Sequence, residues 1–474
     1  MLITLLSILT GLNVSLAATE VLSLDQYLNQ VKAKGTNYLA AFSTSQGALK
    51  RSNESDLLIS PTLFSNIQIG TDRSPRNNPS FEGTRADQQS FELGVSQVTT
   101  FGLSGRIYYS LSNTTIYGAS SSFLPQPSYY LGRPTLELSQ PLIRNGLGSE
   151  TQALIEASRA QALMTHHLED YRARMSLVQA EMSYWRLTAA REILAIQNEN
   201  LERAKKLREW NTGRAKLRLA DHSDVLQAEA NYRFRLMEQH SAMDEERSAS
   251  ESFNSLRGLS SKSVQESLVK LGDAASLRSD HLIELKKEII RSDAQSIVEG
   301  FKLADASAKM GYEKNLPTLD LVGSVSLNGR SETLSPAVSE SLKTQQNIAG
   351  VQLKFSMPFN IGQGASDRAA YQAESVAAEA RRDRAIFDEE RDWSDLIERY
   401  KETRKKLDLS QELELAQKEK YEYERGRQSG GRSTTFIVLQ FEQDYALAQT
   451  MRIRVQAELL GLLAQAKLYK KEGG

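Results

Sequence analysis

The sequence predicts an α+β membrane protein in which a β-barrel continues into a long tube of α-helices, built from an internally duplicated chain. Two stretches, residues 136–148 and 353–364, each carry an alternating apolar and polar run to Ser-x-Pro and then to a turn that contains glycine. A very long proline-free segment of mixed polar and apolar residues follows each turn. Because proline cannot donate to a sheet ladder or sit inside a helix, it is expected where strand structure stops. The predicted joints between barrel and tube are Pro141 and Gly146, and Pro358 and Gly362.

Composition and charge narrow the class of protein. The chain has 474 residues, of which 25% are charged and 7% aromatic, with no cysteine and a net charge of -1. So small a net charge gives no electrostatic reason to expect nucleic acid as a partner. Residues 1–17 form the only long apolar run, which is shorter than the ~20 residues of a membrane-spanning helix and ends in small residues, Ser15 and Ala17. This pattern predicts a cleaved signal peptide, and any membrane insertion is then expected as a barrel.

The first half of the chain reads as helix, strands and helical hairpin in that order. Residues 18–60 carry apolar residues at helical spacing, with Ser23 as N-cap. Residues 61–141 alternate with a period of two in four places, separated by polar loops or a turn, as strands do. Residues 142–258 predict a hairpin of a helix of about 60 residues, a break at Gly213 and a second helix from about Ser223. The serine-rich residues 259–279 are interpreted as a linker.

The second half repeats this order. Residues 280–316 predict a helix, and residues 317–358 alternate cleanly, with one apolar and one polar side, as strands of a barrel with a wet interior would. Residues 359–474 predict a helix from about Ala365, a break, and a final helix from about Thr434. The glycines expected at the turns of the two hairpins are Gly213, Gly426, Gly430 and Gly431.

The two halves share sequence as well as order. Val225–Tyr232 matches Val438–Tyr445, and Gly213 falls on Gly426 at the same offset of 213 residues. Two generic coiled-coil segments would not place strands and prolines alike, so we interpret the match as a duplication. A long isolated helix cannot bury its apolar stripe, and the strands of one chain are too few for a wide barrel. Both observations predict that several copies assemble.

The Ser-Gln-Pro-Leu junction, its Ser-Met-Pro-Phe echo and the duplicated Val-Leu-Gln segments resemble the TolC-type outer membrane efflux protein family over residues 20–470. The resemblance implies a homotrimer in the outer membrane of a Gram-negative bacterium, with four strands per protomer in a twelve-stranded barrel. It also implies a coiled-coil periplasmic tunnel whose tip meets a periplasmic adaptor and an inner-membrane transporter. Such proteins are passive exit ducts of tripartite efflux or type I secretion systems, which pass drugs, metals or polypeptides. They are not enzymes and hold no cofactor.

The sequence departs from this pattern in two places. The predicted hairpin over residues 91–111 is extra relative to four strands, and it either adds staves to the barrel or folds elsewhere. At the tunnel tip, family members often carry acidic residues. Asp224 occupies such a position in the first repeat, although an N-cap role fits it equally well. The second repeat has no acid there, which favours a neutral or apolar constriction. The candidate tip residues are Asp224, Arg432, Phe436 and Gln440.

The sequence contains no motif typical of a metal site or a phosphate-binding loop. No two of the five histidines have the i, i+4 spacing of a helical zinc site, and the glycine pairs near both joints lack the context of a phosphate loop. Two other classes remain as alternatives. A periplasmic adaptor would need one helical hairpin and a compact β-sandwich. A structural coiled-coil surface fibre would need sustained heptads without duplicated strand blocks. The residues do not indicate the transported substrate.

Overall fold

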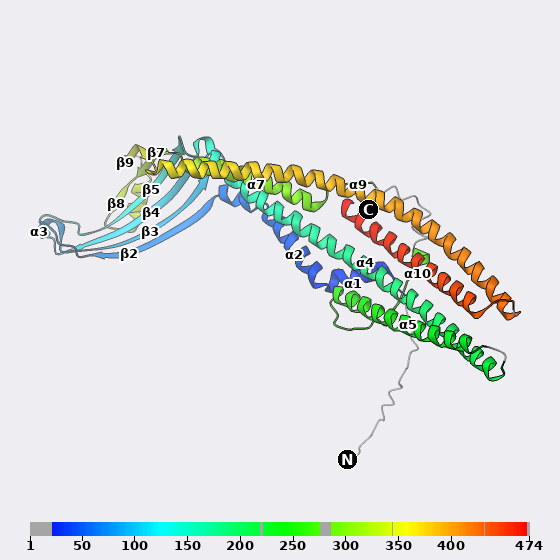
Figure 1. Ribbon diagram of the computed structural model, residues 1–474. Helices are drawn as coiled ribbons and strands as arrows, with labels where there is room; N and C mark the ends of the chain where they lie inside the picture. Colours follow the sequence, from blue (N-terminus) through cyan, green and yellow to red (C-terminus); the bar gives the residue numbers. More distant parts are fainter. Residues whose placement is uncertain (1–20, 219–220, 275–285, 344, 431, 472–474) are drawn as a thin grey trace, which may run out of the picture. The chain divides into compact units, whose positions relative to one another are not determined.

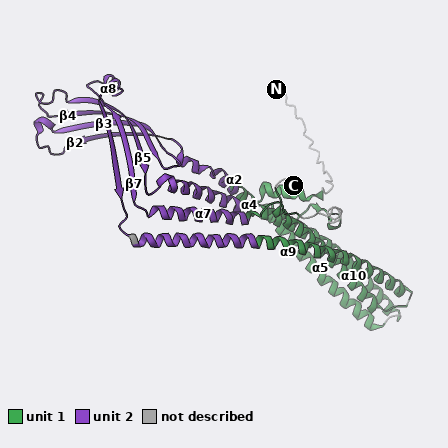
Figure 2. Cartoon of the chain, turned by 90° about the horizontal axis from the view of Figure 1, so that it is seen from above, with its two compact units in different colours: residues 1–43, 169–292, 388–474 green, residues 44–168, 293–387 purple. Residues whose placement is uncertain are grey.

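The computed structural model describes residues 21–218, 221–274, 286–343, 345–430 and 432–471. The predicted signal peptide and Gly431 therefore lie outside the described residues. The chain divides into two compact units, coloured separately in Figure 2. Unit 1 comprises residues 1–43, 169–292 and 388–474, and unit 2 comprises residues 44–168 and 293–387. The units are described separately below.

Unit 1 is built mainly of helices around an aromatic core. Tyr27, Tyr184 and Phe253 are completely buried. The rings of Tyr27 and Phe253 stack with centroids 4.0 Å apart, and the Tyr27 hydroxyl donates to the Phe253 carbonyl oxygen at 3.0 Å. A two-stranded parallel sheet joins β1 (Val21–Leu22) to β6 (Ser267–Leu268) beside this core. The helices that contribute residues to unit 1 are α1 (Leu24–Lys34), α2 (Thr36–Arg51), α4 (Ser149–Lys216), α5 (His222–Leu256), α9 (Ile361–Ser429) and α10 (Thr435–Ala466), followed by η3 (Lys467–Tyr469).

The first predicted helix is present but is not continuous. Ser23 is its N-cap, as predicted, and exchanges both hydrogen bonds of a capping box with Gln26. The helix ends at Gly35, whose N–H donates to the Val31 carbonyl oxygen at 2.7 Å, and α2 begins at the next residue. A 3-10 helix, η1 (Glu54–Ile59), follows α2. The apolar residues keep a helical spacing through both helices, so the sequence pattern did not indicate this break.

The helix predicted from residue 280 begins later, at Ser292, as α7 (Ser292–Lys314). Residues 275–285 lie outside the described part, and residues 286–291 are not helical. Their polar groups are bound by other segments instead: the Lys287 ammonium pairs with Glu389 at 2.5 Å, and the Arg291 guanidinium pairs with Asp392 at 3.2 Å. These contacts hold the segment extended against α9, which explains why helix periodicity was misleading here.

The two long helices are longer than predicted. α4 has 68 residues and α9 has 69, each about 100 Å at 1.5 Å per residue. Gly213 and Gly426 lie inside these helices, so the predicted breaks at both are wrong in position. A single glycine costs a helix only about 1 kcal/mol relative to alanine, which packing along so long a helix outweighs. α4 ends instead at Lys216, before α5 begins at His222, and α9 ends at Ser429, before α10 begins at Thr435. Among the described helices, none is both long and apolar enough to cross a bilayer.

Unit 2 contains an antiparallel seven-stranded sheet, seen at the left of Figure 1. Its order is β2-β3-β4-β5-β7-β9, and the short β8 pairs with the end of β5. β3 and β4 are the extra hairpin, and they lie inside the sheet between β2 and β5. The chain therefore offers six long strands where the family resemblance implied four. The strands are β2 (Thr62–Asp72), β3 (Arg85–Val98), β4 (Ser104–Tyr117), β5 (Ser128–Pro141), β7 (Thr318–Leu327), β8 (Gly329–Ser331) and β9 (Asn347–Ser356), with short helices α3 (Pro79–Glu82) and α8 (Leu334–Ser341) in the connections.

Candidate functional site

The register of the sheet sorts its side chains onto two chemically different faces. Successive residues of a strand point to opposite faces, and residues paired across strands share a face. The first face carries large apolar side chains that are exposed in the single chain. A contiguous exposed apolar patch normally marks a surface that contacts a partner or lipid. One row across it, from β2 to β7, consists of Leu63, Val95, Ile107, Leu136 and Val325, all of which are exposed.

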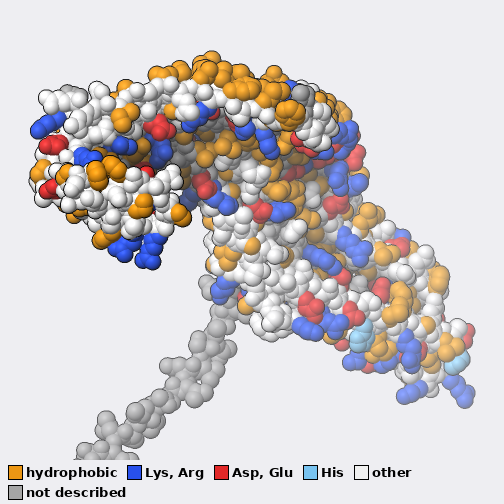
Figure 3. All heavy atoms as spheres, turned by 90° about the vertical axis from the view of Figure 1, so that its left-hand side faces the viewer, with side chains coloured by type: hydrophobic (Ala, Val, Ile, Leu, Met, Phe, Trp, Pro, Cys, Tyr) orange, Lys and Arg blue, Asp and Glu red, His pale blue; other side chains and the backbone are white. Residues whose placement is uncertain are grey.

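The opposite face is polar and lines the hollow of the curved sheet. Figure 3 shows Lys, Arg, Asp and Glu side chains in this hollow and hydrophobic side chains along the outside of the curve. The Arg106 guanidinium pairs with Glu92 at 3.4 Å and lies 5.0 Å from the ring centre of Phe64. Arg133 donates to the Asn328 amide oxygen at 2.7 Å. The face therefore carries charges of both signs and can remain in contact with water.

The first joint is a tightly braced loop between β5 and α4. β5 ends at Pro141, as expected, and one further hydrogen bond follows it, from the N–H of Leu142 to the Leu319 carbonyl oxygen at 2.7 Å. Arg144 donates to both carboxylate oxygens of Glu150, at 2.7 and 2.8 Å. The Asn145 side-chain oxygen accepts from the N–H of Thr151 at 2.9 Å.

Gly148, rather than Gly146, is the glycine that this loop requires. Gly148 has a positive φ of 81°, and a Cβ there would overlap the Thr100 carbonyl oxygen and lie 2.6 Å from the Phe101 Cα. Gly146 has no positive φ, and a Cβ there would meet nothing within 4 Å. Thr100 and Phe101 form the turn of the extra β3–β4 hairpin, so this hairpin rests on the first joint.

The second joint is more open. β9 ends at Ser356, two residues before Pro358, so strand structure stops before this proline. Phe359 is fully exposed, and Gly362 lies in the first turn of α9. The Asn360 side chain accepts from the N–H of Gln363 at 3.2 Å, in the manner of a cap. The two prolines thus occupy similar positions in the sequence but different structural settings.

The predicted tip residues lie at the starts of the two shorter helices of unit 1. Asp224 is three residues past Asp221, the N-cap of α5, so the N-cap role considered for Asp224 is wrong. Phe436 is the second residue of α10 and is 57% exposed, and Gln440, one turn later on the same side, is also exposed. Arg432 is exposed in the turn before them. The structure therefore brings Arg432, Phe436 and Gln440 to one hairpin end and Asp224 to the end of the other hairpin.

Glu424 holds the second turn together, and the sequence did not single it out. Its carboxylate accepts from the Ser433 hydroxyl at 2.5 Å and pairs with Arg427 at 3.3 Å, although the residue is almost completely buried. Thr434 caps α10 by accepting from the N–H of Ile437 at 3.5 Å. Burial of the carboxylate, which makes these local donors necessary, is visible only in the structure, so the sequence held no signal for this role.

A buried ion pair joins the two hairpins inside unit 1. The Arg203 guanidinium on α4 donates to the Glu442 carboxylate on α10 at 2.8 Å, and the Glu442 side chain is only 4% exposed. Burial opposes the charge on Arg203, but the hydrogen bond to Glu442 and the electrostatic attraction of Glu442, Tyr421 and Glu199 together outweigh it, so the pKa of the guanidinium is raised. Glu442 belongs to the duplicated segment. Its counterpart Glu229 pairs within α5 with Arg233.

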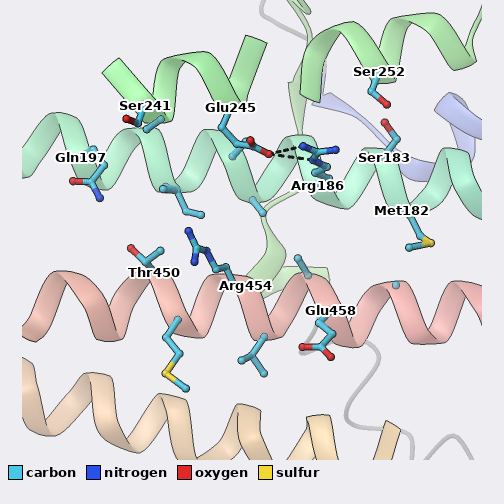
Figure 4. A pocket seen from close by; sticks show the side chains of 18 of the residues that line it. Met182, Ser183, Arg186, Gln197, Ser241, Glu245, Ser252, Thr450, Arg454 and Glu458 are labelled. Carbon is cyan, nitrogen blue, oxygen red and sulfur yellow. Dashed lines mark hydrogen bonds and ion pairs between the residues drawn. The ribbon is translucent and has the colours of Figure 1, made fainter. Parts of the chain in front are cut away.

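An open groove of about 1350 Å³ runs between α4, α5 and α10 in unit 1 (Figure 4). Its mixed lining includes the exposed Met182 and the surface pair Arg186–Glu245, whose nearest atoms are 2.7 Å apart, facing Arg454 on α10. Within the described residues, no cluster of His, Cys, Asp or Glu has the makings of a metal site.

Comparison with solved structures identifies the fold. The chain is similar to the Campylobacter jejuni CmeC outer membrane channel, with 14% identity, a TM-score of 0.62, and coverage of 94% of this chain and 85% of that chain. It is similar to the outer membrane protein VceC of Vibrio cholerae, with 12% identity, a TM-score of 0.64, and coverage of 94% and 95%. The open state of the Neisseria gonorrhoeae MtrE outer membrane channel gives 15% identity, a TM-score of 0.62, and coverage of 94% and 88%.

Comparison of sequences gives less. No family model matches the sequence, and the search of characterised proteins returned no match. Similarity at 12–15% identity rests on structure and establishes the fold alone. The resemblance drawn from the junction and repeat motifs is confirmed at that level: this chain has the fold of the outer-membrane channels CmeC and MtrE and of the outer membrane protein VceC.

Proposed function

We propose that this protein is a passive exit duct in the outer membrane of a Gram-negative bacterium, serving a tripartite efflux or type I secretion system. The observation that carries this proposal is the two-faced sheet, apolar and exposed outside, polar and charged within its hollow. A sheet with these faces suits a wall between lipid and water. Its occurrence in a chain with the fold of outer-membrane channels supports the same function. A compact β-sandwich, which a periplasmic adaptor would need, is not found among the described strands.

The barrel is proposed to form from several copies through the two outermost strands. β2 and β9 each have one unpaired edge within the described chain, and an unpaired edge is very unfavourable in lipid. An even number of antiparallel strands makes β2 and β9 run in opposite directions, so β2 of one copy can continue the antiparallel order beside β9 of the next. Three copies with six strands each would give an eighteen-stranded barrel, a size that leaves an aqueous channel.

The hairpin ends are proposed as the periplasmic mouth, where an adaptor and an inner-membrane transporter would meet the channel. Support comes from the placement of Arg432, Phe436 and Gln440 together at the end of the α9–α10 hairpin, with exposed side chains. In an assembled trimer, three such ends and three ends carrying Asp224 would surround the axis. The exposed ring of Phe436 is the natural obstacle to ion flow there.

Conductance of the purified protein in a planar bilayer tests the proposed function. We expect discrete single-channel steps from the intact protein, and we expect the protein in the outer-membrane fraction of cells. A variant that lacks β7 and β9 should no longer be found in that fraction. If the protein were a periplasmic adaptor, the same deletion would not change its location. Absence of channels from folded, membrane-inserted protein would refute the proposal.

The width of the barrel tests the six-strand contribution separately. Removing residues 85–117 deletes β3 and β4 and leaves β2 next to β5 with the same polarity of pairing. With strands about 4.8 Å apart and tilted by about 40°, eighteen strands give a backbone radius of about 18 Å and twelve give about 12 Å. Electron microscopy of the particle viewed down its axis should show this narrowing. An unchanged diameter would mean that the hairpin is not part of the wall.

A further inference from the structure

The short helix α8 lies against the sheet instead of extending into solvent. It packs on β5 and β8, and two of its own residues, Ala337 and Ser341, are completely buried. The Ser341 hydroxyl is 2.9 Å from the Tyr109 hydroxyl on β4. Two glycines make this approach possible: a Cβ at Gly329 would overlap the backbone of α8, and a Cβ at Gly132 would overlap the Tyr109 hydroxyl and crowd the Ala337 carbonyl oxygen. The helix is therefore fixed to the sheet by close contacts.

The face that α8 covers is the apolar one. Gly132 pairs with Leu111, which pairs with Phe91, which pairs with Ile67, so all four share a row and a face. Tyr109 also points to this face, because it stands two residues from Ile107 and Leu111 along β4. In the proposed barrel this face meets lipid, and α8 would stand on the lipid side of the wall.

The position of α8 along the strands places it at the outer margin of the apolar band. The lowest apolar row, near the joints, pairs Leu319 with Phe355, and the row of Gly132 and Gly329 lies ten residues further along the chain, through β7 to β8. Ten residues at about 3.3 Å each, tilted by about 40°, rise roughly 25 Å. The apolar band of a membrane barrel is about 25 Å tall, so α8 lies where hydrocarbon gives way to headgroups.

The exposed surface of α8 is amphipathic, as is typical of a helix at the boundary between hydrocarbon and headgroups. Leu334, Val338 and Leu342 recur every four residues and therefore share one side, and Leu334 and Leu342 are 47% and 65% exposed. Glu340 is exposed and lies on the opposite side of the helix. Apolar groups along one side and a charge along the other are what a helix at a membrane surface needs.

We propose that α8 is an interfacial helix that lies in the headgroup region of the outer leaflet, with Leu334, Val338 and Leu342 in contact with lipid and Glu340 in contact with water. This inference rests on the proposed function, because it needs the sheet to be a membrane wall. The helix would fix the height of the barrel in the bilayer. The partner of α8 is a lipid surface. The apolar side of α8 is continuous with the apolar face of the sheet, which favours lipid over a protein partner.

The chain has no cysteine, so single-cysteine variants can be labelled cleanly. The full-length protein, as Leu342→Cys or as Glu340→Cys, is labelled with a small environment-sensitive fluorophore and inserted into phosphatidylcholine vesicles. Some vesicles carry a nitroxide near the lipid headgroup, others a nitroxide near the acyl terminus, and iodide is added from the aqueous side. We expect headgroup-level nitroxide to quench the label at position 342 at least threefold more than the label at position 340, with the opposite order for iodide.

Two further variants separate the possible failures. Leu353→Cys places a label on the apolar face of β9, one row above the lowest apolar row, and lipid nitroxide should quench it if the sheet is a membrane wall. Quenching at 353 with equal responses at 342 and 340, or with no lipid quenching at 342, overturns the assignment of α8 alone. Absence of lipid quenching at 353 overturns the proposed function. Leu334→Cys repeats the measurement from the same side of the helix should Leu342→Cys fail to fold.

Discussion

Replacing Gly148 with alanine should destabilise the first joint by about 3 kcal/mol. The left-handed backbone of Gly148 disfavours any side chain by about 1–2 kcal/mol. The added Cβ would also overlap the Thr100 carbonyl oxygen, so the β3–β4 turn must shift by about an ångström. That shift weakens the hydrogen bonds that Gln152 donates to Thr100 at 3.1 Å and Gln140 donates to Phe101 at 3.4 Å. Each contributes about 1 kcal/mol or less.

Urea titration of folding into lipid vesicles, followed by circular dichroism, measures this change in the free energy of unfolding. A loss of about 3 kcal/mol lowers the ratio of folded to unfolded protein by roughly a hundredfold. Gly146→Ala is the matched control, because Gly146 has an ordinary backbone and open space around it. We expect its stability to stay within about 1 kcal/mol of the parent. Equal losses at both positions, or none at Gly148, would refute the reasoning from backbone and contact.

Three other outcomes follow from unit 1. Phe436→Ala removes an exposed ring from the proposed mouth and should raise the resting conductance in planar bilayers, whereas unchanged conductance would remove Phe436 from the constriction. Arg203→Met leaves the buried Glu442 carboxylate without its cation and should destabilise the protein by about 3–5 kcal/mol in denaturant titrations at neutral pH, an effect that the double variant with Glu442→Leu should largely reverse. The Arg257 guanidinium donates to Glu266 at 2.7 Å and lowers the pKa of that carboxyl, so its stabilisation is present above the unfolded pKa, about 4.3, and is lost as pH falls through the lower folded value. Glu266→Gln should therefore be less stable than the parent at pH 7 and equal to it at pH 2, and a difference independent of pH would contradict this reasoning.

The repeated order of helix, strands and hairpin could be predicted from the sequence because each element carries a strong periodic signal. Periods of two and of three to four residues are local properties, and proline marks their limits. Element boundaries that depend on distant contacts could not be predicted. The extended segment before Ser292 is held by Glu389 and Asp392 on α9, about a hundred residues away, and no local pattern reports such partners.

The candidate site was predictable in outline and not in detail. Alternation along the strands separated polar from apolar residues correctly, but the place of the extra hairpin within the sheet needed the register of β3 and β4. Glycine was a weak indicator of turns, because Gly213 and Gly426 lie inside long helices without interrupting them. Gly146 was named as the joint glycine in place of Gly148, because the role of Gly148 depends on Thr100, which lies on a different hairpin.

The two joints differ in a way that affects how the protein would respond to mechanical load. The first is clamped by a bidentate ion pair, an asparagine cap and the turn of a neighbouring hairpin, while the second has one asparagine cap and a fully exposed phenylalanine. Under a bending force on the helices, we expect the first joint to deform less than the second. A symmetric ring of copies would repeat this difference between the two joints of each chain around its axis.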